Sequence, residues 1–302
     1  MSWKKIMLRI GIVLTLLVVI AGATGFYIYH EVTKTTSVIY HPIEKTEKRV
    51  EPVSVKEKNP FSVLLLGVDK RPGDQGRSDS LMVITVNPTN HTTKIISIPR
   101  DTRTEIVGKN RTDKINHAYA FGGIQMSVNT VEKFLNIPID YYLEVNMEGF
   151  KGIVDAIGGV EVMNTLDFTN DGFHFKKGLL SLNGEKALSF SRMRYEDPQG
   201  DFGREARQRQ IIQEVINKGT KIKSLVSYKD ILNSISKNLE TNLTLDEMFD
   251  IQKSYRGATD SIEQQQLEGS GKMIKGIYYY LVPEKNRLAL SNELRDQLGL
   301  TQ

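Results

Sequence analysis

The stretch SVLLLGVD, Ser62 to Asp69, decides the fold, because it is an uninterrupted apolar run that ends at a carboxylate. Such a run is typical of a strand that is covered on both faces. Two further β-rich runs follow, SLMVITVN (Ser80 to Asn87) and KIISI (Lys94 to Ile98), and the residues Pro88 to His91 between them have the composition of a turn. The sequence therefore predicts a strand followed by a β-hairpin.

Helical and strand-like patterns alternate along the rest of the chain. Apolar spacing, caps such as Asn183, and the break at Gly122-Gly123 predict helices at 113–121, 124–135, 150–157, 185–193 and 202–222. Strands are predicted at 140–146 and 160–163, and the C-terminal part adds helices at 228–239 and 245–255 and a strand at 277–282. This alternation predicts an α/β fold, a mixed sheet with helices on its faces.

Composition excludes several classes of function. The net charge is +4, but Lys4, Lys5 and Arg9 precede any acidic residue, and the remainder holds 37 basic and 36 acidic residues. A domain this close to neutral does not suit a nucleic-acid partner. The chain has no cysteine, which excludes disulfides, thiolate nucleophiles and cysteine-bound metals. Its five histidines lack metal-ligand spacing, and neither a G-x-S-x-G nor a P-loop motif occurs.

The run IGIVLTLLVVIAGATGFYIY, Ile10 to Tyr29, carries no charge. It is about long enough to cross roughly 30 Å of hydrocarbon as a helix, and the cations before it place residues 1–9 in the cytoplasm. The sequence thus predicts a single-pass protein of the cell membrane with an extracytoplasmic stalk at 30–60 and an extracellular globular domain at 61–302. A signal peptide cleaved after Ala21-Gly22-Ala23 and a buried core helix are the alternatives.

Arginine is concentrated in one part of the chain. Ten of the fifteen arginines lie between Arg71 and Arg209, and the stretch from Arg192 to Arg209 holds five arginines and no lysine. The guanidinium fork binds phosphate oxygens bidentately, so this concentration favours a phosphate ligand. On the helix predicted from residue 202, one face carries Arg204, Arg207 and Gln208. The alternative is a solvated surface whose arginines pair with Glu196, Asp197, Asp201 and Glu205.

Acidic residues stand at the ends of two predicted strands. Asp69 follows one strand and Asp79 immediately precedes the next. Carboxylate pairs of this kind bind Mg²⁺, which in turn bridges phosphate oxygens. Pairing of Asp69 with a nearby arginine and capping of a turn by Asp79 are the alternatives. In SIPRDT, Arg100 and Asp101 follow the third strand, where Arg100 is expected to contact phosphate unless the two form only a turn salt bridge.

Read in order, these segments resemble the LytR-CpsA-Psr family. The match covers about half of the chain, from Phe61 to about Ile216, and one position departs from the family pattern, because Phe190 replaces the usual tyrosine before the R-x-R word. The matching words are LLLGVD (64–69), GRSDSL (76–81), SIPRDT (97–102), KINHAYAFGG (114–123), GGVEV (158–162), LNGEKAL (182–188), SRMR (191–194) and GDFGREARQ (200–208).

The resemblance implies a three-layer α/β/α sandwich with a central mixed sheet, preceded by one transmembrane helix. It further implies an apolar pocket for a polyisoprenyl chain and a transferase that moves a polymer, commonly wall teichoic acid, from a polyisoprenyl-pyrophosphate carrier onto peptidoglycan. Asp69 and Asp79 match the carboxylates that the family associates with Mg²⁺. The positions that match its pyrophosphate site are Arg77, Arg100, Lys114, Arg192, Arg194, Arg204 and Gln208, with Arg207 beside them.

In the mechanism that these residues suggest, an acceptor sugar hydroxyl attacks the sugar-linked phosphorus while the arginines and Mg²⁺ neutralise the leaving phosphate. Either Asp101 or Asp201 would accept the hydroxyl proton, and the sequence does not choose between them. A hydrolase that uses water as the acceptor is one alternative. A non-catalytic envelope protein that senses lipid-linked polymers, or acts as an attenuator, is another.

Overall fold

The structure is a computed structural model that describes residues 38–44, 48–49, 51–71, 74–221 and 235–300. The predicted membrane anchor at 10–29 and most of the predicted helix at 228–239 lie outside these residues. No helix within the described ranges is long and apolar enough to cross a membrane.

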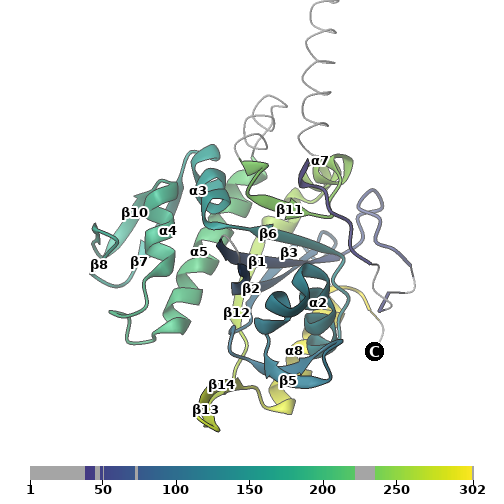
Figure 1. Cartoon of the computed structure of the whole chain (residues 1–302). Helices are drawn as coiled ribbons and strands as arrows, with labels where there is room; N and C mark the ends of the chain where they lie inside the picture. Colours follow the sequence, from purple (N-terminus) through teal and green to yellow (C-terminus); the bar gives the residue numbers. More distant parts are fainter. Residues whose placement is uncertain (1–37, 45–47, 50, 72–73, 222–234, 301–302) are drawn as a thin grey trace, which may run out of the picture.

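A six-stranded mixed sheet forms the centre of the molecule (Figure 1). Strands β1, β2 and β3 are consecutive antiparallel neighbours, β6 and β12 join them in parallel, and β11 closes the edge antiparallel to β6. The predicted hairpin is therefore confirmed. In order across the sheet the strands are β11 (Leu239–Thr241), β6 (Tyr141–Val145), β1 (Phe61–Arg71), β2 (Asp74–Asn87), β3 (Thr92–Ser97) and β12 (Ser261–Gln266).

Helices pack on both faces of this sheet. Alternate residues of β1 point in opposite directions, so Leu64, Leu66 and Val68 pack against α2 (His117–Leu135) and α8 (Glu284–Gln297). Leu65 faces the other way and joins a cluster with Ile212 and Ile216 of α5 (Asp201–Gly219). This arrangement confirms an α/β fold with a central mixed sheet.

The remaining helices agree with the predicted pattern. The side chain of Asn183 accepts a hydrogen bond from the Lys186 amide and caps α4, as expected. Beyond Ala156, the last residue of α3, Gly158 and Gly159 follow with positive φ and lead into the strand β7 (Val160–Asn164). The Thr244 capping box begins α7. These elements are α3 (Met147–Ala156), α4 (Gly184–Arg192), α7 (Leu245–Ser254) and the short 3-10 helix η1 (Arg256–Thr259).

Small two-stranded sheets surround the central one, and one of them corrects a prediction. Residues 113–114 were expected to begin a helix, but β5 (Arg111–Lys114) pairs with β4 (Arg103–Ile106), and α2 begins only at His117. Tertiary pairing overrides the local helical spacing here. The other small sheets join β7 (Val160–Asn164) with β10 (Gly178–Leu182), β8 (Phe168–Asn170) with β9 (Phe173–Phe175), and β13 (Ser270–Ile274) with β14 (Ile277–Leu281).

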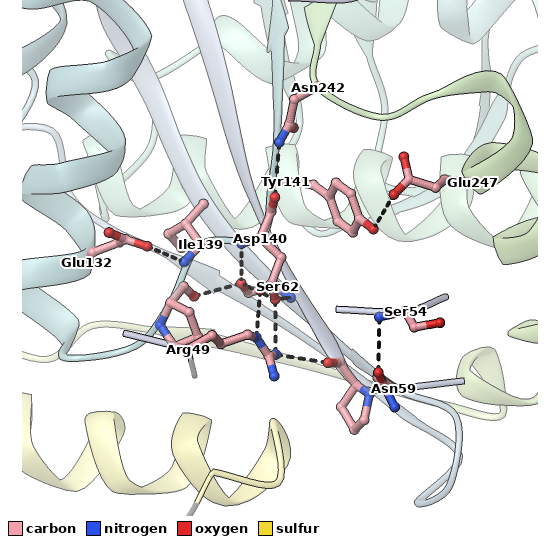
Figure 2. A network of polar contacts seen from close by, with 12 residues as sticks. Arg49, Ser54, Asn59, Ser62, Glu132, Ile139, Asp140, Tyr141, Asn242 and Glu247 are labelled. Carbon is pink, nitrogen blue, oxygen red and sulfur yellow. Dashed lines mark hydrogen bonds and ion pairs between the residues drawn. The ribbon is translucent and has the colours of Figure 1, made fainter. Parts of the chain in front are cut away.

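The described part of the segment expected to be a stalk packs against the domain. The guanidinium of Arg49 donates to both carboxylate oxygens of Asp140, at 2.6 and 3.1 Å, and to the Pro60 carbonyl (Figure 2). Asp140 also accepts a hydrogen bond from the backbone amide of Ser62, the second residue of β1. Ile39 is fully buried. Arg49 therefore helps to fix the starts of β1 and β6 through Asp140, so the described part of this segment does more than space the domain from another element.

Candidate functional site

A cavity of about 620 Å³ lies between one face of the sheet and the helices α3 and α5. Its walls come from β1, β2 and β6 on one side and from α3 and α5 on the other, and α4 contributes Leu188 and Arg192. The apolar lining consists of Val63, Leu65, Leu66, Val68, Met82, Ile84, Leu143, Val145, Met147, Phe150, Ile153, Val154, Leu188, Ile212, Val215 and Ile216. The polar lining includes Asp69, Asp79, Ser80, Arg100, Asn170, Asp171, Arg192, Arg194, Tyr195, Arg204 and Gln208.

The two kinds of lining residue are segregated along the elements. On α5, Arg204 and Gln208 line the cavity in the first turns, and Ile212 and Ile216 continue the same stripe at the i+4 spacing. On β1 the lining runs from apolar residues to Asp69 at the carboxyl-terminal end. The cavity is therefore amphiphilic, with a charged end and an apolar end.

A β-bulge positions Asp79 at the charged end. Gly67 pairs with Ser80 and Val68 pairs with Ser78, so Asp79 is the extra residue between them. Bulges re-aim a side chain and are common beside functional sites. Asp69, one residue beyond the bulge on β1, lines the same cavity.

Arg100 connects the carboxylate of Asp79 with α5. Its Nη1 lies 2.5 Å from Asp79 Oδ1, and its Nε lies 3.8 Å from Asp201 Oδ2. Burial opposes the positive charge of Arg100, but Asp201 and Asp79 outweigh it and raise the pKa of the guanidinium above its ordinary value. Arg204 donates to Asp201 Oδ2 at 3.0 Å and to the Asp79 carbonyl at 3.2 Å. Burial lowers the pKa of Arg204, but a guanidinium stays protonated in proteins, so both arginines are cationic. The contacts with Asp79 and Asp201 hold them at fixed positions.

Arg192 and Arg194 bring two more cations to the cavity lining. Arg194 Nη2 donates to the Tyr195 hydroxyl at 2.6 Å, and its guanidinium lies over the Tyr195 ring. Among the residues that the structure describes, no carboxylate pairs with either arginine. Gln208 completes this end, and its Oε1 accepts the Ser80 hydroxyl at 3.0 Å. The site thus holds cationic groups that remain available to an anionic ligand.

Five of the predicted site residues do not line the cavity. Asp101 pairs with Lys114 at 2.6 Å beside the cavity. Asp201 pairs with Arg100 and Arg204, which line the cavity, and Arg77 is exposed. Arg207 differs from the others, because its guanidinium is buried and engaged within the protein. It pairs with Asp197 at 2.5 Å and donates to the carbonyls of Phe190 and Met193. These contacts favour a structural role for Arg207.

The donor set of Asp69 and Asp79 fits a magnesium ion only in part. No group of three acidic, histidine or cysteine side chains that could hold a metal occurs in the described ranges. Mg²⁺, however, is commonly bound by one or two carboxylates together with water and substrate phosphate. Two carboxylates beside four arginines meet that requirement if a phosphate is bound as well.

Sequence reasoning missed two features of the site. The first is the set of residues that forms the apolar wall of the cavity. The alternation of apolar residues in β1, β2 and β6 and the i+4 spacing on α5 could have predicted this wall. The second is Glu205, which is 5% exposed and has one carboxylate oxygen without a partner in the structure. Burial, and then the nearby Asp201, raise the pKa of Glu205 to about 7. No pattern in the sequence distinguishes this residue from a surface glutamate.

An amphiphilic cavity with arginines and two carboxylates at one end has the chemistry of a site for a phosphorylated lipid. The model of the LytR_cpsA_psr family matches residues 26–296, well beyond the words recognised up to about Ile216. The chain belongs to this family, which confirms the resemblance.

Relatives and solved structures agree. The polyisoprenyl-teichoic acid–peptidoglycan teichoic acid transferase TagU of Bacillus cereus is 54% identical, over 99% of each chain. The crystal structure of B. subtilis TagU is 48% identical with a TM-score of 0.66, and covers 81% of this chain and 99% of its own. The structure of TagT bound to LIIa-WTA is 32% identical with a TM-score of 0.73, and covers 85% of this chain and 97% of its own.

Proposed function

We propose that this protein transfers an anionic glycopolymer, wall teichoic acid, from a polyisoprenyl-pyrophosphate carrier to peptidoglycan. The observation that carries the proposal is the amphiphilic cavity, whose apolar end suits a prenyl chain and whose cationic end suits a pyrophosphate. The names of the relatives support the same activity. The pyrophosphate linkage is already activated, so the reaction needs no nucleotide.

The fixed arginines account for the chemistry. Arg100 and Arg204 are held by carboxylates before any ligand binds, so they stabilise charge that develops on the leaving phosphate without first having to reorganise. Arg192 and Arg194 bind the remaining phosphate oxygens. The acceptor sugar hydroxyl then attacks the sugar-linked phosphorus, that phosphorus–oxygen bond to the carrier breaks, and polyisoprenyl phosphate leaves.

Asp69 and Asp79 would hold Mg²⁺, which would supply positive charge to the pyrophosphate oxygens. For the proton of the acceptor hydroxyl, Asp101 and Asp201 both remain predictions. Asp101 is paired with Lys114, and Asp201 is held by Arg204 and Arg100. Comparing the pH profiles of Asp101→Asn and Asp201→Asn would identify the acceptor.

Replacing Arg100 tests the proposal. In Arg100→Ala, transfer of lipid-linked polymer to peptidoglycan should fall by roughly 10²–10³-fold, as when one donor to a developing oxyanion is removed. Arg256→Ala, on the exposed surface of η1, is the matched control and should transfer normally. Near-normal transfer by Arg100→Ala would refute the role, and release of free polymer by the wild-type protein would identify a hydrolase instead.

We propose in addition that the uncharged run at 10–29 anchors the protein in the cell membrane with its catalytic domain outside. Such an anchor would keep the cavity beside the membrane that contains its lipid substrate. Protease added to intact protoplasts should digest the domain and leave the residues before Ile10 protected. Full protection of the domain would contradict this topology.

A further inference from the structure

The hairpin of β13 and β14 extends from the lower edge of the molecule, away from the central sheet (Figure 1). Met273 and Tyr278 are direct cross-strand partners on one of its faces. Their exposed fractions are 60% and 43%, which is unusual for two large apolar side chains in contact positions. Exposure alone does not identify an interaction site, since Met163 and Leu179 of β7 and β10 form an equally exposed pair. The surroundings of the hairpin decide the matter.

The Tyr278 ring lies flat along the hairpin. A Cβ atom added to Gly271 would meet the Tyr278 hydroxyl at 2.5 Å and its ring carbon Cε2 at 2.6 Å, so the ring crosses the strand at this glycine. A Cβ atom added to Gly269 would meet the Leu281 carbonyl oxygen, and it would lie 2.9 Å from the Tyr280 ring carbon Cε1. The glycines therefore allow two tyrosine rings to lie on one side of the hairpin.

This face of the hairpin is joined to the charged end of the cavity. The Tyr280 amide donates to the Asp101 carbonyl at 2.8 Å, and the Tyr280 ring contacts Phe202, with centroids 5.5 Å apart. Phe202 directly follows Asp201. Burial, then Asp101 and Asp201, raise the pKa of Tyr278, as expected for a phenol close to both carboxylates. The aromatic face thus runs up to the residues that flank Arg100.

Charge indicates which substrate this face accepts. The cations of the region are on the opposite side, where Arg103 and Lys114 lie over the Tyr279 ring. On the Tyr278 side the hairpin contributes only Gly271, Met273 and Tyr280, and the charged groups that shift the pKa of Tyr278 are the carboxylates of Asp101 and Asp201. A polyanionic donor polymer would be repelled here. An uncharged sugar backbone, with apolar ring faces and hydroxyl groups, matches exposed tyrosine.

We propose that the Tyr278 face of the β13–β14 hairpin docks the glycan strand of the acceptor. The proposal rests on the proposed transferase function. The strand lies across Met273 and Tyr278, and one of its sugars reaches past Phe202 to the charged end of the cavity. The hairpin then governs how well a long acceptor is captured, and it takes no part in binding the lipid carrier.

The test compares Tyr278→Ala and Tyr278→Phe with wild type, using full-length protein in detergent micelles. Acceptors are uncross-linked glycan strands and a single disaccharide unit, with lipid-linked polymer as donor. Loss of one aromatic contact should raise the KM for glycan strands about tenfold in Tyr278→Ala. Tyr278→Phe should keep a wild-type KM for glycan strands. In both variants, kcat, the KM for the donor and the KM for the disaccharide should remain near wild type.

Leu179→Ala is the matched control, because Leu179 is 65% exposed and also pairs with an exposed methionine, Met163, in the two-stranded sheet of β7 and β10. It should leave every constant unchanged. An unchanged KM for glycan strands in Tyr278→Ala, or a raised KM for the donor, would overturn the proposal. Wild-type protein that binds glycan strands but transfers nothing would instead refute the transferase function, and fluorescence anisotropy of labelled strands measures this binding separately.

Discussion

Arg204 and Arg207 lie one turn apart on α5, yet their guanidinium groups have different surroundings. Arg204 reaches the cavity and contacts Asp201 and the Asp79 carbonyl. Arg207 reaches the opposite way, into a buried pair with Asp197 and over the Phe168 ring. The sequence places both on one helical face, but only the packing of the loop before α5 decides which of them can meet a ligand.

Removing Arg207 should therefore destabilise the fold. Arg207→Ala leaves Asp197 buried without its partner, which typically costs about 3–5 kcal/mol. Urea unfolding would measure this loss. The double variant Arg207→Met/Asp197→Leu removes both charges and should recover much of the stability, since replacing a buried pair by apolar residues is often neutral. A stable Arg207→Ala protein that had lost affinity for pyrophosphate lipid would instead restore Arg207 to the binding site.

Glu205 should make stability depend on pH. Its pKa is about 7 in the folded protein, against an ordinary value of 4.5, so the folded state holds the proton more tightly than the unfolded state. Stability is then greatest below about pH 4.5 with respect to this group, and it falls as the pH rises to about 7. At about 1.4 kcal/mol for each pKa unit, the loss is on the order of 3 kcal/mol.

Glu205→Gln, which keeps the shape without the charge, is the test. The variant should be more stable than wild type at pH 8 and should lose the part of the pH dependence between about pH 4.5 and 7. Urea unfolding at a series of pH values measures both. Parallel curves for the two proteins across this range would contradict the assignment.

At the scale of the elements, the sequence predicts what local pattern determines. The apolar run of β1, the β2–β3 turn and the Asn183 cap of α4 depend on neighbouring residues and are confirmed. The β4–β5 pairing and the bulge at Asp79 depend on contacts between strands, which spacing alone does not reveal. The strand ends that carry Asp69, Asp79 and Arg100 were therefore predictable as a group, but not the way the bulge positions them.

The first turn of α5 depends on a close approach at Gly203. A Cβ atom there would collide with the Asp197 carboxylate, which pairs with Arg207. Gly203→Ala should displace Asp197, lower stability by about 1–3 kcal/mol and reduce transfer, because the loop that follows Arg194 would move. Gly219→Ala on the same helix is the control, since no atom lies within 4 Å of the added Cβ, and it should stabilise by up to about 1 kcal/mol. Equal effects at both positions would contradict this packing.

For the whole molecule, the arrangement that matters is the order of residues along the cavity. Arg204, Gln208, Ile212 and Ile216 form one stripe on α5, and the charged end of β1 lies beside the charged end of that stripe. The sequence contains this stripe, but the stripe lines a cavity only if the sheet face opposite it is left uncovered. That space exists because α3 and α5 stand over β1, β2 and β6 without filling the gap between them.

The stripe leads to a prediction about substrate length. In Ile216→Trp, the larger ring occupies space two turns beyond Gln208, at the apolar end, while the cationic end is unchanged. Affinity for a long-chain polyprenyl pyrophosphate should fall about tenfold or more, since overpacking costs about 1–3 kcal/mol. Affinity for geranyl pyrophosphate should stay near wild type, because a short tail ends before Ile216. Leu288→Trp, on the exposed side of α8, is the control, and isothermal titration with both lipids measures the difference. An equal loss for both lipids would mean that the tail does not extend along this stripe, and that the cavity binds the head group alone.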